Sequence, residues 1–162
     1  MSAGKYSMPD ALAYLLTWTT YGSWLPGDAR QWVHKRGSAA IAYCEPDSKR
    51  AQFARQLMEQ APVRLDSVER RAVGDAIRRV CAFKGWALGA LNVRSNHVHV
   101  VVTAADEGPE CVMVCLKAWA SRRLNESRGD KERRRWWTRH GSTRYLNTPE
   151  ALQRAVEYVV NQ

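Results

Sequence analysis

The sequence predicts an α+β fold in which amphipathic helices cover an antiparallel sheet. Three observations lead to this prediction: a β-rich segment at 11–20, two adjacent β-rich segments at 86–93 and 96–103, and apolar residues at helical spacing over 68–81. The chain has 162 residues, which is a usual size for one domain, and it contains no internal repeat. We therefore expect a single domain over residues 1–162.

The first predicted strand runs into an irregular insert. Residues 21–46 are rich in Trp and Gly, and Pro26-Gly27-Asp28 is a strong turn signal. A helix is expected from about 47 to 60. A second helix is expected from Asp66, because the run Asp-Ser-Val-Glu that starts there has the form of a capping box.

The second half of the chain completes the pattern. A tight turn at 94–95 joins the two β-rich segments into a hairpin, and a helix is expected from Pro109 to about Asn125. One or two short strands follow within 136–146, and Thr148 caps a final helix. This order is that of a split β-α-β unit, which is a ferredoxin-like antiparallel sheet with helices packed on one face. The other face is then free for a ligand.

Positive charge suggests a polyanionic partner. The chain has 25 Lys and Arg against 16 Asp and Glu, a net charge of +9. The positive charge is concentrated between residues 117 and 139. This uneven distribution argues against a basic surface that serves only solubility. We predict that this stretch contacts nucleic acid through Lys117, Arg122, Arg123, Arg133, Arg134, Arg135 and Arg139.

Two tryptophans of the insert, Trp24 and Trp32, have two interpretations. They either plug the edge of the core or stack on unpaired bases, as aromatic side chains do in proteins that bind single strands. The sequence alone leaves both open.

The cellular setting follows from absences in the sequence. The four cysteines form no CxxC pair, which suggests neither a zinc knuckle nor a secreted disulfide framework. No apolar run approaches the ~20 residues that span a bilayer, and no export signal begins the chain. We expect a cytoplasmic, nucleoid-associated protein without membrane contact.

Two histidines on one predicted strand form a candidate metal site. Strand alternation puts His97, His99 and Val101 on one face, while the intervening valines look toward a core. Side chains two residues apart have Cβ atoms about 7 Å apart, so both imidazoles can converge on one ion. A pair of surface histidines remains the alternative. The histidine-triad nucleotide hydrolases need a third histidine at the next alternate position, and Val101 stands there. This argues against that class.

The final helix carries a candidate nucleophile. Tyr158 and Gln162 are four residues apart, so a phenol and a carboxamide lie on the same helical face. Taken alone, Tyr158 is more typical of a core or rim tyrosine.

Together these residues resemble a known family. The run HVHVVV at 97–102, the Arg-rich helix, the run WWTRHGS at 136–142 and the tyrosine-bearing C-terminal helix resemble the single-tyrosine HUH transposases of the smallest bacterial insertion sequences and the REP-associated tyrosine transposases. The long insert departs from that pattern.

The resemblance implies a role for each of these residues. His97 and His99 would bind a divalent metal, Gln162 would be its third ligand, and Tyr158 would be the nucleophile. His140 would lie at the edge of the active site. It also implies a homodimer, in which the tyrosine helix acts at the metal site of its own subunit or of the partner subunit, and a substrate of single-stranded or hairpin DNA.

The implied chemistry is strand cleavage and transfer. A phenol with an ordinary pKa of about 10 is a poor nucleophile at neutral pH, so a metal must stabilise the developing charge. Mixed nitrogen and oxygen ligands suit Mn²⁺ or Mg²⁺. The expected product is a 5′-phosphotyrosine link. The alternative is a domesticated protein that binds hairpin DNA or structured RNA without cleavage. A replication initiator or relaxase is disfavoured, since no helicase or primase segment accompanies the tyrosine helix.

Overall fold

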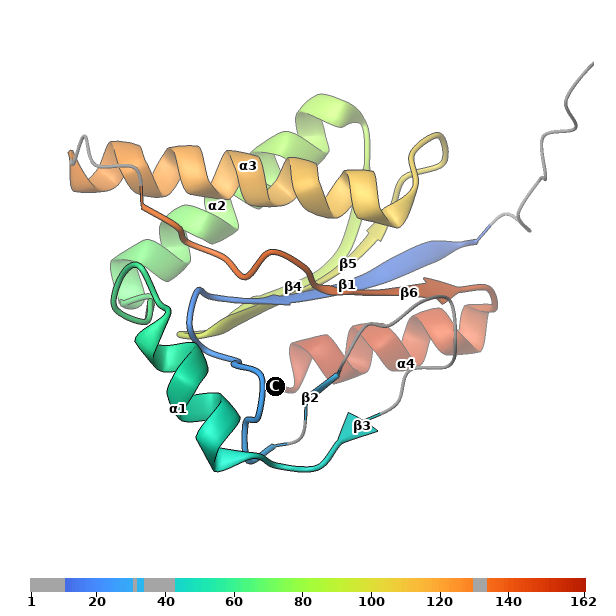
Figure 1. Cartoon of the computed structure of the whole chain (residues 1–162). Helices are drawn as coiled ribbons and strands as arrows, with labels where there is room; N and C mark the ends of the chain where they lie inside the picture. Colours follow the sequence, from blue (N-terminus) through green and yellow to red (C-terminus); the bar gives the residue numbers. More distant parts are fainter. Residues whose placement is uncertain (1–10, 31, 34–42, 130–133) are drawn as a thin grey trace, which may run out of the picture.

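A four-stranded antiparallel sheet forms the centre of the molecule. The computed structural model describes residues 11–30, 32–33, 43–129 and 134–162. The sheet order is β4-β5-β1-β6, and each neighbouring pair is antiparallel (Figure 1). The strands are β1 (Ala13–Thr19), β4 (Ala87–Val93), β5 (His97–Thr103) and β6 (Ser142–Leu146). The predicted α+β class and the predicted hairpin are both confirmed.

The predicted insert is mostly turns and bends in its described part. It also contains a two-stranded ladder of β2 (Trp32–Val33) and β3 (Tyr43–Cys44). Helix α1 (Ser48–Gln56) follows and is capped by Asp47, so it ends earlier than the expected residue 60. Gly27 packs against its N-terminus with φ of 88°, and a Cβ there would collide with the carbonyl oxygen of Asp47. The turn at Gly27 therefore requires glycine.

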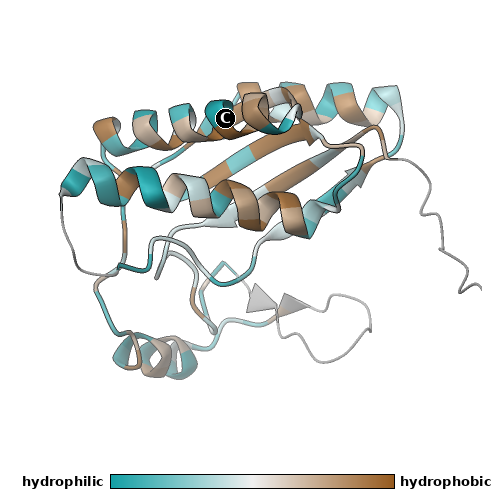
Figure 2. Cartoon of the chain, turned by 90° about the horizontal axis from the view of Figure 1, so that it is seen from above, coloured by the Kyte–Doolittle hydropathy of each residue, from teal (hydrophilic) through white to brown (hydrophobic). Residues whose placement is uncertain are grey.

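Two long helices cover one face of the sheet. They are α2 (Ser67–Lys84) and α3 (Pro109–Arg128), which pack side by side on that face (Figure 1). The capping box predicted at Asp66 is present, and α2 ends at Gly85 in the left-handed conformation. Hydrophobic and hydrophilic residues alternate along the helices over the sheet, as amphipathic helices require (Figure 2).

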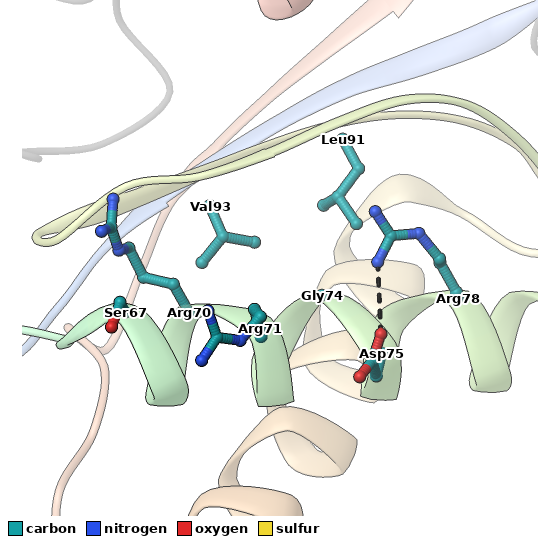
Figure 3. A pocket seen from close by; sticks show the side chains of 8 residues that line it. All are labelled: Ser67, Arg70, Arg71, Gly74, Asp75, Arg78, Leu91 and Val93. Carbon is teal, nitrogen blue, oxygen red and sulfur yellow. Dashed lines mark hydrogen bonds and ion pairs between the residues drawn. The ribbon is translucent and has the colours of Figure 1, made fainter.

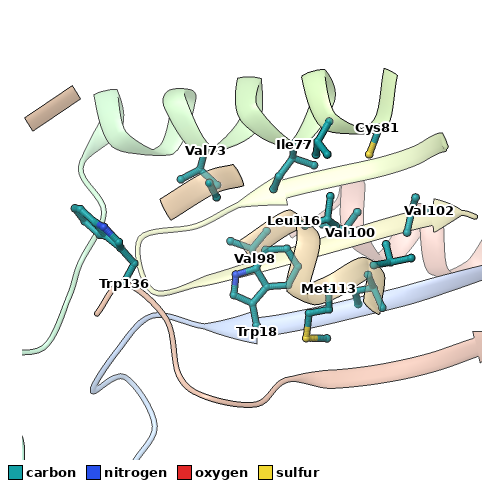
Figure 4. Packing of buried hydrophobic residues seen from close by; sticks show 14 of the residues in the cluster. Trp18, Val73, Ile77, Cys81, Val98, Val100, Val102, Met113, Leu116 and Trp136 are labelled. Carbon is teal, nitrogen blue, oxygen red and sulfur yellow. The ribbon is translucent and has the colours of Figure 1, made fainter. Parts of the chain in front are cut away.

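The main core lies between this helical layer and the sheet. The valines of β5 that alternate with the histidines point into it, as predicted, and they meet side chains of α2, α3 and β1 (Figure 4). Its fully buried members include Leu16, Trp18, Ile77, Val98, Val100, Val102 and Leu116.

The opposite face of the sheet is not free. Helix α4 (Pro149–Val160) packs on it, with Ala155 and Val159 buried against Ala90 and Val101 (Figure 1). The expectation of an open ligand face was wrong, because the small apolar residues on this face need a cover of their own. Thr148 caps the helix as predicted, accepting a hydrogen bond from Ala151 N at 3.1 Å. The tyrosine-bearing helix thus shares its face with the histidines.

None of the helices in the described ranges is long and apolar enough to cross a bilayer.

An ion pair between a buried carboxylate and a partly exposed arginine ties the two long helices together. Glu69 is 5% exposed and closes the capping box through the Asp66 amide. Its other carboxylate oxygen accepts a hydrogen bond from Arg128 Nε at 2.7 Å. One carboxylate thus joins the start of α2 to the end of α3.

Glu69→Ala should lower the free energy of unfolding by about 2 kcal/mol, because it removes a cap and leaves Arg128 without its partner. Urea denaturation measures the change. Asp75→Ala is the matched control on the same helix, since its ion pair with Arg78 is 3.4 Å long and exposed on both sides. That control should move stability by less than about 0.5 kcal/mol. Equal losses in both variants would contradict this role for Glu69.

Candidate active site

The two histidines lie together at the start of β5. His97 and His99 have ring centroids 4.8 Å apart with planes at 75°. β5 holds them on the α4 side of the sheet, and Val101, the next residue on that side, packs under α4. His99 is only 6% exposed, while His97 is half-buried. The predicted convergence of two imidazoles on one face is therefore present.

A hydrogen bond to Nδ1 orients each imidazole. Thr17, opposite His99 on β1, places its Oγ1 2.8 Å from His99 Nδ1. Asn96 Oδ1 lies 2.7 Å from His97 Nδ1. With Nδ1 engaged in both rings, Nε2 is the nitrogen left to bind a ligand.

The end of α4 brings Tyr158 and Gln162 to the histidines. The Tyr158 ring centroid lies 5.5 Å from that of His99, and Tyr158 is 50% exposed. The Gln162 side chain lies beside both imidazoles and raises the pKa of each. All four residues predicted for the site are thus brought together, and they belong to one chain.

The last turn of α4 is anchored to the β4–β5 hairpin. Arg94 Nη1 donates to the main-chain oxygen of Gln162 at 2.8 Å. Asn92 Nδ2 donates to the same oxygen at 3.1 Å and to Val159 O at 2.9 Å. Two hairpin side chains therefore fix the backbone at the end of α4 and at Gln162.

Burial keeps both imidazoles neutral. Burial lowers the pKa of His99 to about 4, and the charge of Arg94 and that of His97 when it is protonated act in the same direction. Burial, and then Arg94, also lower the pKa of His97. In both cases the neighbouring Gln162 side chain opposes the shift. At neutral pH both rings are in the form that binds metal ions.

The donor set fits a divalent metal. Over the part of the chain that the structure describes, no group of three or more His, Cys, Asp and Glu residues could hold an ion. Two neutral imidazoles and a carboxamide oxygen nonetheless converge here, and the imidazoles have the Nδ1 partners that metal-binding histidines usually have. Nitrogen and oxygen donors of this kind suit Mn²⁺ and Mg²⁺ better than thiophilic ions.

Lys117 does not point outward as expected. Its ammonium donates to the carbonyl oxygens of Thr138 at 3.0 Å and His140 at 3.1 Å. Burial lowers the pKa of Lys117 to about 8. Helical spacing predicts the direction in which Lys117 leaves α3. It does not predict that residues 138–140 pack over this side of the helix and accept its hydrogen bonds.

The predicted arginines separate into two groups. Arg122 and Arg123 are exposed on α3, which covers the face opposite the histidines, and Arg134 lies over the ring of Trp136. Arg135 and Arg139 instead line a cavity together with Trp24. Arg133 lies outside the described residues.

The two remaining predictions have partial outcomes. The Trp32 side chain lies outside what the structure describes. His140 is exposed, and its segment runs close to the site, because Thr138 Oγ1 lies 3.0 Å from the hydroxyl of Thr19, the β1 partner of His97. Its role in the active site stays a prediction.

Sequence reasoning missed the residues that support the site. Thr17, Asn92, Arg94 and Asn96 hold the histidines and the end of α4 in place. A signal existed for three of them, since polar residues interrupt the β-rich hairpin next to His97. No sequence signal marked Thr17, because its contact with His99 depends on the register of two strands that are distant in sequence.

A basic groove was also missed. It runs between α2 and β4, has a volume of about 480 Å³, and presents Arg70, Arg71 and Arg78 beside the apolar side chains of Leu91 and Val93 (Figure 3). Only Arg78 among these three has an acidic partner in the groove, Asp75. Such a groove suits a phosphate backbone.

Comparison with known structures identifies the class of fold. The chain is similar to a REP-associated tyrosine transposase bound to a REP hairpin, with 11% identity, a TM-score of 0.53, and coverage of 98% of this chain and 70% of that one. It is also similar to a candidate transposase from Deinococcus radiodurans R1, with 16% identity, a TM-score of 0.52, and coverage of 100% and 98%. At these identities the likeness concerns the fold, which is that of transposase structures.

The sequence itself identifies the family. Residues 58–162 match the family described as "Transposase IS200 like", which is more than half of the chain. The protein belongs to this family of transposases. None of the curated proteins matches the chain.

Gly141 lies against the strand that supports His99. A Cβ at this position would come within 2.6 Å of both the Thr17 carbonyl oxygen and Met113 Sδ. Gly141→Ala should therefore lower the free energy of unfolding by about 2 kcal/mol through forced displacement of β1 or α3. Chemical denaturation of purified protein measures the loss.

Gly108→Ala is the control, since no atom lies within 4 Å of the added Cβ. This change at the N-cap of α3 should lower the free energy of unfolding by less than about 1 kcal/mol, the usual range for an exposed helix cap. A Gly141→Ala protein as stable as the wild type would mean that the close approach to Thr17 is relieved without cost.

Proposed function

We propose that this transposase cuts and rejoins single-stranded DNA through a covalent bond to Tyr158, with a divalent metal bound at His97, His99 and Gln162. The observation that supports this most directly is the meeting of these four side chains at one point. The Tyr158 and His99 ring centroids lie 5.5 Å apart, and the Gln162 side chain lies beside both imidazoles. A purely structural role for each residue would not explain why all four side chains lie together.

The proposed cleavage is an in-line substitution at phosphorus. The Tyr158 oxygen attacks the scissile phosphate, the bond from phosphorus to the 3′ oxygen breaks, and the phenolic proton is lost while the 3′ oxygen gains one. The product is a 5′-phosphotyrosine and a free 3′-hydroxyl. Since one phosphate ester replaces another, the 3′-hydroxyl of a second strand can reverse the step without ATP.

Each protein group has a defined task in this scheme. Tyr158 is half exposed, so its oxygen can reach a strand bound from solvent. Thr17 and Asn96 hold the imidazoles in the orientation needed for coordination through Nε2. A bound Mn²⁺ or Mg²⁺ supplies charge stabilisation for the phosphate and the phenolate.

The substrate we propose is hairpin DNA with single-stranded flanks. The similar transposase structure holds a REP hairpin. In this chain, arginines on α3 and in the groove beside α2 provide cations for the phosphate backbone. The tyrosine site itself lies at the end of α4, where half-exposed Tyr158 is open to a strand that approaches from solvent.

We also propose that one chain contains a complete site. The resemblance to single-tyrosine transposases implies a homodimer, in which the tyrosine could act on either metal. Within one chain, however, α4 already packs on its own sheet through Val159 and Ala155, and its end is hydrogen-bonded to Asn92 and Arg94. In a dimer each subunit would then cut with its own tyrosine.

Tyr158→Phe should abolish the covalent adduct that forms when the protein is incubated with hairpin oligonucleotides and Mn²⁺, because phenylalanine has no nucleophile. Denaturing gels detect the adduct. Tyr145→Phe is the control, since this tyrosine lies on β6 with its ring against Tyr14, at 5.4 Å between centroids. Adduct lost equally in both variants would contradict the assignment. Tight binding without adduct for every hairpin would instead favour the non-cleaving alternative.

Thr17→Val should weaken Mn²⁺ binding by about 10–100-fold, because the His99 ring loses the partner that orients it. Calorimetric titration of the metal measures this. Thr103→Val is matched to it at the other end of the same strand pair, where the Thr103 hydroxyl donates to Leu12 O at 2.8 Å. Wild-type affinity in Thr17→Val would show that this hydroxyl does not support the metal site.

A mixture of two inactive variants tests the single-chain site. Tyr158→Phe and the double variant His97→Ala/His99→Ala each lack one half of the chemistry. If each chain uses its own tyrosine, the mixture should form no adduct after prolonged incubation. Adduct in the mixture, at a level well above that of either variant alone, would mean that α4 serves the partner subunit.

A further inference from the structure

A second cavity lies where the described part of the insert meets the segment before β6. Its volume is about 710 Å³, within the range of roughly 300–1,000 Å³ typical of sites for small organic groups. Its walls combine aromatic side chains from Tyr21, Trp24 and Trp137 with apolar ones from Leu57 and Met58. An aromatic cavity of this size has room for an unpaired nucleotide and is too small for a duplex.

We propose that this cavity binds a single unpaired base of the DNA strand, stacked on Trp24. The inference rests on the proposed function and extends it, since it assigns a base-binding site separate from the metal site. A base inside a duplex has both faces covered by its neighbours, so only an unpaired base can enter such a cavity.

The aromatic walls are held in place before any ligand arrives. Trp137 Nε1 donates to Ser121 Oγ at 2.9 Å, and its ring meets Trp18 edge-on at 6.1 Å between centroids. Tyr21 OH accepts a hydrogen bond from Glu59 N at 3.1 Å. These contacts fix Trp137 and Tyr21 from behind, so binding a base costs little reordering.

Trp24 is the exposed member of the set. It is 43% exposed, and the Arg30 guanidinium lies over its ring, 5.3 Å from the centroid. Arg30 is itself held by the Asp28 carboxylate at 2.7 Å and by Ser23 O at 2.6 Å. A large exposed indole with a guanidinium held against its ring is typical of surfaces that stack bases.

Positive charge lines the other side of the cavity. Arg135 and Arg139 both lie on it. Gln60 fixes the backbone of Arg135 through two hydrogen bonds, to its O at 2.8 Å and from its N at 2.9 Å. Arg135 is paired with Glu59 at 3.2 Å, but both side chains are more than half exposed, so water screens that pair. The phosphates next to an inserted base would therefore meet cations.

The cavity continues from the active site along two chain segments. β1 carries Thr17 and Thr19, which pair with His99 and His97, and the cavity begins at Tyr21. On the other segment, Thr138 N donates to Thr19 O at 3.0 Å, and Thr138 itself lines the cavity. The base cavity and the residues opposite the histidines are thus only a few positions apart along both segments.

The experiment uses Tyr158→Phe protein, in which the DNA stays intact, and compares Trp24→Ala, Trp24→Phe and Phe53→Ala in that background. Phe53 is the matched control, an aromatic residue that is 61% exposed on α1 and does not line the cavity. The probes are a blunt DNA hairpin, the same hairpin with a single-stranded thymidine tail on either end, and tailed hairpins with one abasic position. Fluorescence anisotropy gives the affinities.

Trp24→Ala should bind one of the tailed hairpins about tenfold more weakly and the blunt hairpin with unchanged affinity, a loss typical of one stacked base. One abasic position in the tail should weaken DNA binding by the Tyr158→Phe protein to the same degree. It should have no further effect on the affinity of the Trp24→Ala variant. Trp24→Phe should retain most of the affinity, and Phe53→Ala all of it. Equal losses for blunt and tailed hairpins, or an abasic effect that persists in Trp24→Ala, would overturn the proposal.

The two proposals fail in different ways. If the protein with an intact Tyr158 forms no adduct but the abasic effect still depends on Trp24, the base site stands and cleavage does not. If adduct forms while Trp24→Ala binds every tailed hairpin normally, cleavage stands and the base site is rejected. Absence of binding to all three kinds of probe rejects both.

Discussion

The register between β1 and β5 is the constraint on which the rest of the molecule depends. It places Thr17 opposite His99 and Thr19 opposite His97, so a hydroxyl supports one imidazole from the central strand. A shift by one residue would turn the histidines into the main core and the valines toward α4. The same pairing sets where β1 ends and hence where the insert and its cavity begin. The site and the core are therefore specified by one set of backbone hydrogen bonds.

Much of this arrangement could be predicted from local patterns. Alternation in β5, the capping box of α2 and the Thr-Pro start of α4 are encoded within a few residues, and all three are confirmed. The expectation that Tyr158 and Gln162 share one helical face was wrong in detail, since α4 ends at Val160 and Gln162 lies just beyond the helix. What joined these pieces into a site was resemblance to a family, because no local pattern says which face of a sheet a helix covers.

The errors came from contacts between distant segments. The sequence gives no sign that α4 covers the histidine face, which depends on the small residues Ala90 and Val101 leaving room for Val159. Lys117 was assigned to the DNA surface from its helix position, yet the backbone of residues 138–140 returns over it and takes its ammonium. The supporting role of Thr17 is similarly a product of strand pairing across 82 residues. Such contacts exist only once the chain is folded.

The placement of α4 separates what keeps the protein folded from what would make it cut. The large apolar core lies on the α2 and α3 side, whereas Tyr158 is half exposed and belongs to neither buried cluster. Replacement of this tyrosine therefore removes a reactive group without opening a cavity. Under the proposed function, one substitution at this position would end cleavage and leave the stability, the basic surface and the insert of the protein unchanged.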